Sequence, residues 1–185
     1  MKKLFLIATF AVATMFSLSG NAQVQWQPIE NVGATELKGN TKLFFIDFAT
    51  SWCGWCKKMD RDTYTNKLIA AVLNHYFLSV HFDAESKDAF KWNGQEFAGS
   101  TKRNTPHSFT TAILGRQIGY PSVAVFDQNM KLVQVLSGYQ GPEDFIKFIC
   151  FFVNDNYKKY NVQNFMEVFD SQILPEIKKE IEFED

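Results

Sequence analysis

Two of the three cysteines in this 185-residue chain, Cys53 and Cys56, lie three positions apart. A pair with this spacing can bind a metal, close a structural disulfide or exchange electrons as a dithiol–disulfide couple. A structural zinc site needs four ligands, and the three histidines of the chain show no ligand spacing that would complete one. Covalent haem attachment requires a histidine directly after the second cysteine, where this chain has Lys57. A disulfide across two residues closes too small a loop to stabilise much, so the spacing favours thiol–disulfide exchange.

The residues around the pair suit this chemistry. The near-continuous apolar run of residues 42–50 ends just before Cys53, and a helical pattern begins there. Free N–H groups and the helix dipole at a helix N-terminus stabilise a thiolate, and Lys57 and Lys58 add positive charge. We therefore expect Cys53 to be the attacking thiolate. We expect Cys56, one turn further along, to be more buried and to resolve the mixed disulfide.

The elements that must position the pair follow from hydrophobic periodicity. Residues 42–50 predict a strand buried on both faces. Residues 65–76 repeat apolar side chains at the i, i+3, i+4 spacing of an amphipathic helix, with Thr65 as the expected N-cap. Residues 77–85 predict the next strand. Strand, helix and strand in this order predict a βαβ unit with a parallel strand pair.

The second half of the chain continues less regularly. Residues 86–118 predict a long connection with one or two short helices, and connections of this length are usually functional or mobile. Residues 121–127 and 131–138 predict a β-hairpin. A helix is expected from Pro142, which suits its first turn. Residues 154–185 predict an extra C-terminal helical segment.

Three stretches, FIDFATSWCGWCKKM, GYPSVAVFD and LSGYQGPEDFIKFI, resemble the thioredoxin-fold superfamily. Within this superfamily, the chain resembles extracytoplasmic thioredoxin-like thiol–disulfide oxidoreductases that carry W-C-G-x-C-K-K-M. The resemblance covers roughly residues 40–84 and 117–153. It implies an α/β fold in which helices flank a central mixed β-sheet, within a single thioredoxin-like domain over residues 23–185. Residues 86–118 are then an insertion before a cis-proline, and the C-terminal helical segment is an addition.

The resemblance also assigns roles to individual residues. Asp47 occupies the position of a buried acid that moves the proton on or off the resolving thiol, here Cys56. Burial would raise the pKa of such an acid and suit it to general acid–base work. The alternative is an aspartate at a strand edge that faces solvent. Tyr120 and Pro121 match the cis-proline position, where the backbone can pair with an extended substrate. Gly138 resembles the glycine that lets the substrate approach closely.

The chain departs from the family pattern at several positions. Gly54 and Trp55 replace the Gly-Pro of common reducing enzymes and the Gly-His of isomerases, so the redox potential cannot be read from the motif. Trp55 and Trp52 are expected to contact substrate. Trp52 would screen the pair from water, or be an aromatic at the edge of the core. His81 replaces a lysine and could assist proton transfer near neutrality with Lys57 tuning the charge, or be a satisfied core histidine.

The N-terminus predicts export. Residues 1–22 begin with Lys2 and Lys3, continue with an apolar run over residues 4–18 and end in small residues. This is the pattern of a signal peptide, with cleavage expected after Ala22. The alternative is an uncleaved anchor, but the run is short of the ~20 residues that a span requires. We expect a periplasmic or secreted protein, a compartment in which disulfides persist.

Charge is balanced, with 19 basic and 20 acidic residues, which argues against nucleic acid and membrane surfaces as partners. The leading hypothesis is an exported, monomeric enzyme that acts as a disulfide reductase on protein thiols and disulfides through Cys53 and Cys56. It would need no cofactor and would draw electrons from a membrane donor. One alternative is a binding module that presents Trp55 and Tyr120 and whose cysteines sense redox state. Another alternative is a metal-handling role, such as delivery of copper through the two thiolates. The third cysteine, Cys150, is expected to be a buried, inert thiol.

Overall fold

The structure is a computed structural model, and it describes residues 23–33, 40–102 and 104–184. The predicted signal peptide at residues 1–22 lies outside the described residues. Within the described part of the chain, no helix is both long enough and apolar enough to cross a membrane.

The centre of the fold is a four-stranded sheet with the order β2-β1-β5-β6. Its strands are β1 (Leu43–Ala49), β2 (Phe77–Asp83), β5 (Ser122–Phe126) and β6 (Leu132–Ser137). β1 pairs in parallel with β2 and antiparallel with β5, and β5 pairs antiparallel with β6. The sheet is therefore mixed, which confirms the predicted parallel pair and the predicted hairpin.

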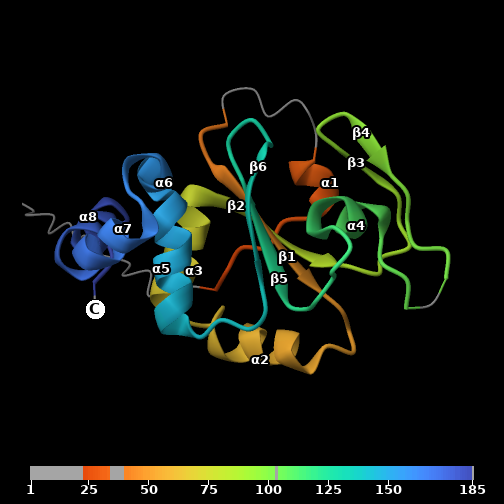
Figure 1. Cartoon of the computed structure of the whole chain (residues 1–185), viewed down its shortest axis with the longest axis horizontal. Coiled ribbons are helices and arrows are strands. Elements are labelled where there is room, and N and C mark those ends of the chain that lie inside the picture. The colour runs from red at the N-terminus through yellow and green to blue at the C-terminus, as the bar shows by residue number, and fades with distance from the viewer. Residues whose placement is uncertain (1–22, 34–39, 103, 185) are drawn as a thin grey trace, which may run out of the picture.

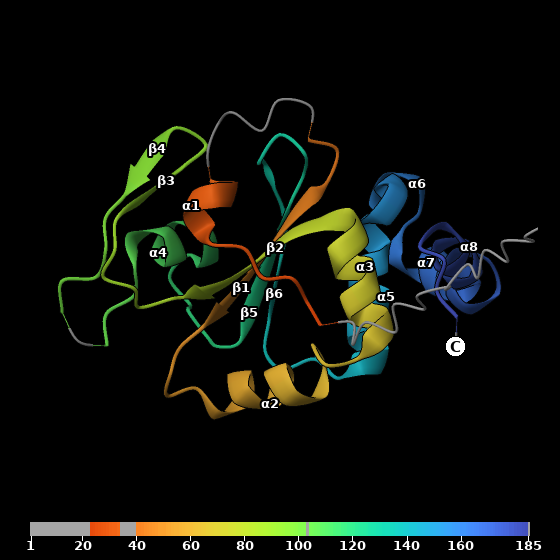
Figure 2. The same ribbon diagram turned by 180° about the vertical axis from the view of Figure 1, so that it is seen from behind.

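Helices cover both faces of the sheet, because every residue of β1 is buried and each face needs an apolar partner. On one face lie α3 (Lys67–Tyr76) and α5 (Pro142–Phe152), which form one core with the sheet. On the other lie α1 (Ile29–Val32) and α4 (Ser108–Leu114), in a second core. Figure 1 and Figure 2 show these two layers, with α2 (Gly54–Asp62) across the end of the sheet where β1 finishes.

The junction between α2 and α3 corrects one prediction. Asn66, and not Thr65, caps α3: its Oδ1 accepts the backbone N–H groups of Leu68 and Ile69 at 3.0 and 3.2 Å. The Thr65 hydroxyl instead donates to the Arg61 carbonyl of α2 at 2.6 Å. An asparagine side chain at the cap position satisfies two of the free N–H groups that begin every helix.

The insertion contains a hairpin that we did not predict, in addition to α4. Strands β3 (Phe90–Trp92) and β4 (Gln95–Phe97) pair antiparallel around Asn93 and Gly94. Both turn residues have positive φ, 47° and 77°, which is the conformation of a type I′ turn. The hairpin buries Phe90, and it covers the second core.

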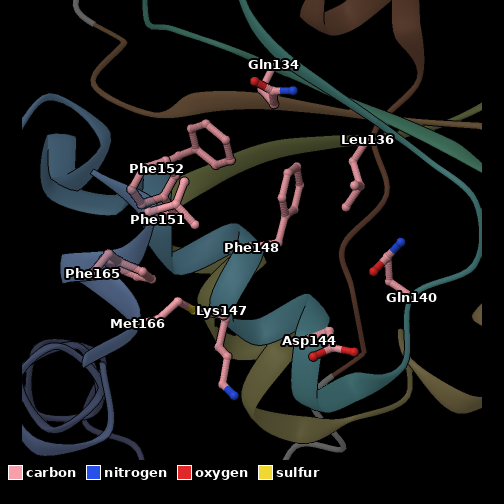
Figure 3. Close-up of a pocket in the computed structure, with 11 residues that line it drawn as sticks. Gln134, Leu136, Gln140, Asp144, Lys147, Phe148, Phe151, Phe152, Phe165 and Met166 are labelled. Carbon is pink, nitrogen blue, oxygen red and sulfur yellow. The ribbon is translucent and has the colours of Figure 1, made fainter. Parts of the chain in front are cut away.

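The C-terminal segment is helical as predicted and extends the first core. Three α-helices follow α5 among the described residues: α6 (Asn156–Lys159), α7 (Val162–Val168) and α8 (Leu174–Glu180). A 3₁₀ turn at Val153–Asp155 precedes α6, and a π-helical turn at Phe169–Ile173 joins α7 to α8. The three α-helices lie beyond α5, away from the sheet (Figure 1). A groove of about 360 Å³ runs between β6, α5 and α7, and Figure 3 shows aromatic rings of α5 and α7 along it.

Phe165 fixes α7 to α5 and gives the first testable prediction. Its side chain is 1% exposed, and its ring centroid lies 5.0 Å from that of Phe151. Truncation would leave a cavity, so Phe165→Ala is expected to lower the free energy of unfolding by about 3–5 kcal/mol in urea denaturation. Met166→Ala, at a neighbouring side chain that is 46% exposed, is the control and should cost less than ~1 kcal/mol. Equal losses in the two variants would contradict the packing described here.

Candidate active site

Cys53 and Cys56 lie at the start of α2 and form a disulfide with a Cα–Cα distance of 5.3 Å. Cys53 is the N-cap residue, and its Sγ accepts the backbone N–H of Cys56 at 3.0 Å. The expected helix N-terminus is therefore present, and the Cys56 N–H in the first turn of α2 points at the sulfur that would carry charge after reduction. In this oxidised form the two residues are similarly buried, at 5% and 3% exposure, so Cys56 is only marginally the more buried.

Asp47 lies in the middle of β1 and is 2% exposed, so the solvent-facing alternative is wrong. It is placed opposite His81 in the parallel register of β1 and β2. Because paired residues of adjacent strands project from the same face, the Oδ2 atom of Asp47 meets the Nδ1 atom of His81 at 2.8 Å. The other oxygen, Oδ1, has no hydrogen-bond partner among the described residues. The hydroxyl of buried Tyr64 also interacts with the Asp47 carboxylate, so His81 is not its only polar neighbour.

The side chain of His81 is 37% exposed and lies near three carboxylates, so it is not an ordinary core histidine. The hydrogen bond to Asp47 raises its pKa above the usual 6.5, and the negative charges of Asp47, Asp60 and Asp83 act in the same direction. Partial burial opposes this rise. The ring of Trp26 packs edge-on against the imidazole with a centroid distance of 5.5 Å. The imidazolium is therefore the favoured form beside the buried carboxylate.

The raised pKa of His81 predicts a pH-dependent stability. A group with a folded-state pKa above its unfolded value stabilises the fold fully below the unfolded pKa, ~6.5, and loses this effect as the pH rises through the folded pKa. The free energy of unfolding of wild type minus that of His81→Gln, from urea denaturation, should therefore be largest below pH ~6.5 and shrink above it. His75→Gln, at an exposed position of α3, controls for the substitution itself. A difference that grows with pH would contradict this assignment.

The peptide bond between Tyr120 and Pro121 is cis, as the resemblance implied. Tyr120 packs against the buried cluster of Ala49, Cys53 and Cys56, which brings the cis-proline loop next to the disulfide. Gly138 donates its N–H to the Pro121 carbonyl at 2.8 Å and has a φ of 94°. A side chain would be strained in that conformation, so the glycine keeps this backbone clear beside the loop.

Two exposed tryptophans flank the disulfide. Trp52 is 60% exposed, donates its indole N–H to Glu85 at 3.2 Å and packs edge-on against Tyr120 at 5.9 Å. It is therefore not an aromatic of the core edge. Trp55 is 59% exposed, and its ring centroid lies 5.5 Å from that of Tyr139. The two indoles give the surface around the disulfide large apolar contact areas, the type of side chain enriched at binding interfaces.

The two lysines after Cys56 differ in their surroundings. Lys57 is exposed and lines a hollow together with Cys56, so its charge can act on the site. Lys58 forms an ion pair with Asp62 and lies over the ring of Tyr139 at 4.6 Å. Lys58 therefore supports the Trp55 side of the site and does not face the sulfurs as a free charge.

Sequence reasoning missed Asp60 and Tyr64, both of which face the acid–histidine pair. Asp60 of α2 places Oδ1 4.0 Å from Nδ1 of His81. Tyr64 is buried, and burial together with the charge of Asp47 raises the pKa of its hydroxyl well above the usual range. The side chains of Asp47, Asp60 and His81 offer atoms within 4.8 Å of one another, a set that a divalent cation could use. The Asp47 Oδ2–His81 Nδ1 distance of 2.8 Å is that of an ordinary charge-assisted hydrogen bond, along which a proton can also be exchanged.

Cys150 lies on the buried face of α5 with no exposed surface, as expected. Burial raises the pKa of its thiol, which disfavours the reactive thiolate. The structure therefore brings together Asp47, Cys53, Cys56, His81, Tyr120 and Pro121, with both tryptophans at the rim, and leaves Cys150 apart from them.

The model of the family described as "Thioredox_DsbH: Protein of unknown function, DUF255" matches residues 13–106. Among curated relatives, "Uncharacterized protein B0495.5" of Caenorhabditis elegans is 28% identical over 67 residues, and "Spermatogenesis-associated protein 20" of Rattus norvegicus is 31% identical over 64. These matches cover 36% and 35% of this chain but 9% and 8% of the relatives. The chain thus matches less than a tenth of the length of these relatives.

Solved structures are similar over most of the chain. A thioredoxin-fold protein from Helicobacter pylori covers 89% of each chain with a TM-score of 0.50 and 13% identity. A structure titled "DsbH Oxidoreductase" has a TM-score of 0.48 and 17% identity, and the match covers 80% of this chain and 92% of that one. The likeness to the Helicobacter pylori protein shows that the fold is a thioredoxin fold.

Proposed function

The chain belongs to the Thioredox_DsbH family, and on this premise we propose that it is a thiol–disulfide oxidoreductase acting on protein dithiols and disulfides. The observation that carries the proposal is the position of the Cys53–Cys56 pair. On a thioredoxin fold, the Cys53 sulfur caps α2 and accepts the Cys56 N–H, and Tyr120 of the cis-proline loop packs against the cluster that both cysteines form with Ala49. A cysteine pair with a purely structural role would need neither the helix N-terminus nor the nearby buried acid.

The reaction we propose has two exchange steps. The Cys53 thiolate attacks one sulfur of a substrate disulfide, which forms a mixed disulfide and releases the first substrate thiolate. Cys56 then gives its proton to Asp47 and attacks Sγ of Cys53. The intramolecular disulfide forms, the second substrate thiolate leaves and takes up a proton, and two electrons have passed to the substrate. The disulfide of this structure is the oxidised end of the cycle.

Substrate binding in this proposal uses the exposed surface around the pair. An extended substrate segment would pair with the backbone of Tyr120 next to cis-Pro121. Trp52 and Trp55 would contact its side chains on either side of the disulfide, and both are exposed and available for this. Lys57, at the rim of the hollow beside Cys56, would tune the local charge.

We also propose the direction and the compartment. The protein is exported, with cleavage after Ala22, and it acts as a reductase. The charge and apolar pattern of residues 1–22 supports export. A reductase outside the cytoplasm has no local source of electrons, so a membrane donor would have to reduce the Cys53–Cys56 disulfide.

The proposed activity is tested by insulin reduction, with dithiothreitol as the terminal reductant. Wild type should accelerate precipitation of the insulin B chain, and Cys53→Ser should reduce the rate to that of dithiothreitol alone. Cys150→Ala removes a thiol that has no place in the site and is the matched control; it should retain the wild-type rate. If Cys53→Ser remained as fast as wild type, the chain would be better described as a binding module.

A further inference from the structure

His81 lies between two carboxylates, one buried and one exposed. Its Nδ1 atom is 2.8 Å from Oδ2 of Asp47, which is buried in β1, and 4.0 Å from Oδ1 of Asp60, which lies on α2. The side chain of Asp60 is 45% exposed, whereas that of Asp47 is 2% exposed. The same ring nitrogen therefore faces an acid in the interior and an acid at the surface.

A hollow of about 280 Å³ connects this cluster with the resolving cysteine. Cys56, Asp60 and His81 all line it, together with Lys57 and Asp83. One water molecule occupies about 30 Å³ in the liquid, so the hollow is large enough for solvent to reach these groups. Asp60 and His81 also line a second hollow, on the side of Tyr64. Asp60 thus lies where the interior cluster meets solvent.

The charges that face His81 come from each element packed against it. Asp47 of β1, Asp60 of α2 and Asp83 of β2 each raise its pKa, and the Asp47 hydrogen bond has the largest effect. The ring of Trp26 covers the imidazole on a further side. The pKa of Asp60 is raised, mainly because the side chain is partly buried, and the charge of His81 opposes this rise. The hydrogen bond to Asp47 is therefore the main reason that the pKa of His81 is raised.

We propose that His81 and Asp60 form the solvent end of the proton path through which Cys56 is deprotonated, with Asp60 as a positioning residue that acts through His81. This inference rests on the proposed function. Sequence reasoning considered His81 alone. The structure adds the second carboxylate and the hollow that both share with Cys56.

The path conserves protons at each step. The Cys56 thiol gives its proton to the Asp47 carboxylate, which becomes a neutral acid. The imidazolium of His81 then loses the partner that held its proton and releases that proton to Asp60 or to solvent water. Neutral His81 next takes the proton from Asp47 on Nδ1, which restores the ionised carboxylate and the imidazolium. One proton has left Cys56, one has reached solvent, and the Cys56 thiolate attacks Sγ of Cys53.

Ellman's reagent, an aromatic disulfide, separates the attack by Cys53 from the resolving step by Cys56. Reduced protein should release a first aromatic thiolate when Cys53 attacks, and a second when Cys56 resolves the mixed disulfide; stopped-flow absorbance records both. Because general acid–base catalysis contributes about 10²–10⁴-fold and Asp60 acts indirectly, Asp60→Asn should slow the second phase about tenfold near neutral pH and leave the first unchanged. Asp60→Glu should recover most of the rate. Asp62→Asn, two residues along α2 and paired with Lys58, is the matched control and should be as fast as wild type.

A double-mutant cycle tests whether the two residues share one path. If they do, Asp60→Asn combined with His81→Gln should be no slower than His81→Gln alone. If the second-phase rate of Asp60→Asn were within twofold of that of Asp62→Asn at every pH, the inference would be overturned. The proposed function would remain intact. Failure of wild type to release the second thiolate would instead count against the proposed function itself. A cooperative urea-unfolding transition of Asp60→Asn, compared with that of wild type, shows that the variant is folded.

Discussion

Cys56→Ser is expected to stop turnover after a single attack and to accumulate a mixed disulfide between Cys53 and its substrate. Cys53 keeps its place at the N-terminus of α2 and can still attack, but no thiol remains to release the adduct. Non-reducing electrophoresis and mass spectrometry after incubation with a disulfide-containing protein should show a covalent complex. Dithiothreitol should reduce its disulfide and separate the two proteins. Multiple-turnover insulin reduction should fall to the background rate.

Two further variants make this result specific. A Cys53→Ser, Cys56→Ser chain should form no complex, since the buried thiol of Cys150 cannot reach a substrate. Cys56→Ser, Cys150→Ala should trap as efficiently as Cys56→Ser. A complex formed equally well by the chain that lacks Cys53 and Cys56 would show that another contact, and not sulfur exchange, holds the partner.

Asp47→Asn is expected to slow the resolving step about 10²-fold near neutral pH, since an amide cannot accept the proton of Cys56 and general bases contribute about 10²–10⁴-fold. The substitution preserves shape, and the first thiolate release with Ellman's reagent should remain close to wild type. The rate loss should diminish at high pH, where Cys56 loses its proton to solvent without help. The pH profile of the second phase is the measurement that checks this.

Asp127→Ala provides a control for loss of stability. Asp127 accepts the backbone N–H groups of Asn129 and Lys131 in the turn between β5 and β6, away from the disulfide. A change there should lower the free energy of unfolding and leave both phases unaltered. If Asp47→Asn resolved the mixed disulfide at the wild-type rate at neutral pH, Asp47 would have no part in the proton transfer.

The strands of the sheet could be predicted from the sequence because each is a short run rich in apolar residues, and the mixed arrangement followed from the resemblance. The strand order β2-β1-β5-β6 was not predicted. Residues 42–50 predicted a buried strand and residues 77–85 the next strand, and the structure has β1 at Leu43–Ala49 and β2 at Phe77–Asp83. The cis bond at Pro121 followed from the resemblance. The hairpin of the insertion was missed although Asn93-Gly94 is a strong hairpin signal. Its strands have three residues each, too short for an alternating pattern to emerge.

The site could be predicted only in part, for a reason that lies in tertiary packing. The cysteines and Asp47 belong to a continuous motif, so their proximity follows from local sequence. Asp60 lies in the charged run Lys57–Asp62, which is typical of a solvated helix face. Its approach to His81 depends on how α2 lies across the end of the sheet, and the contact between Trp55 and Tyr139 depends on the same packing. Hydrophobic periodicity in the sequence does not predict such tertiary contacts.

The most direct test of the central claim is a titration of the Cys53–Cys56 couple against reduced and oxidised glutathione. Thiol alkylation and mass spectrometry measure the reduced fraction at each ratio. We predict a reversible two-electron transition with a potential closer to the ~−270 mV of thioredoxin than to the ~−120 mV of a strong oxidase. A disulfide that stayed fully oxidised or fully reduced at every accessible potential, without exchange, would contradict the account, and a reversible value near −120 mV would overturn the reductase direction alone.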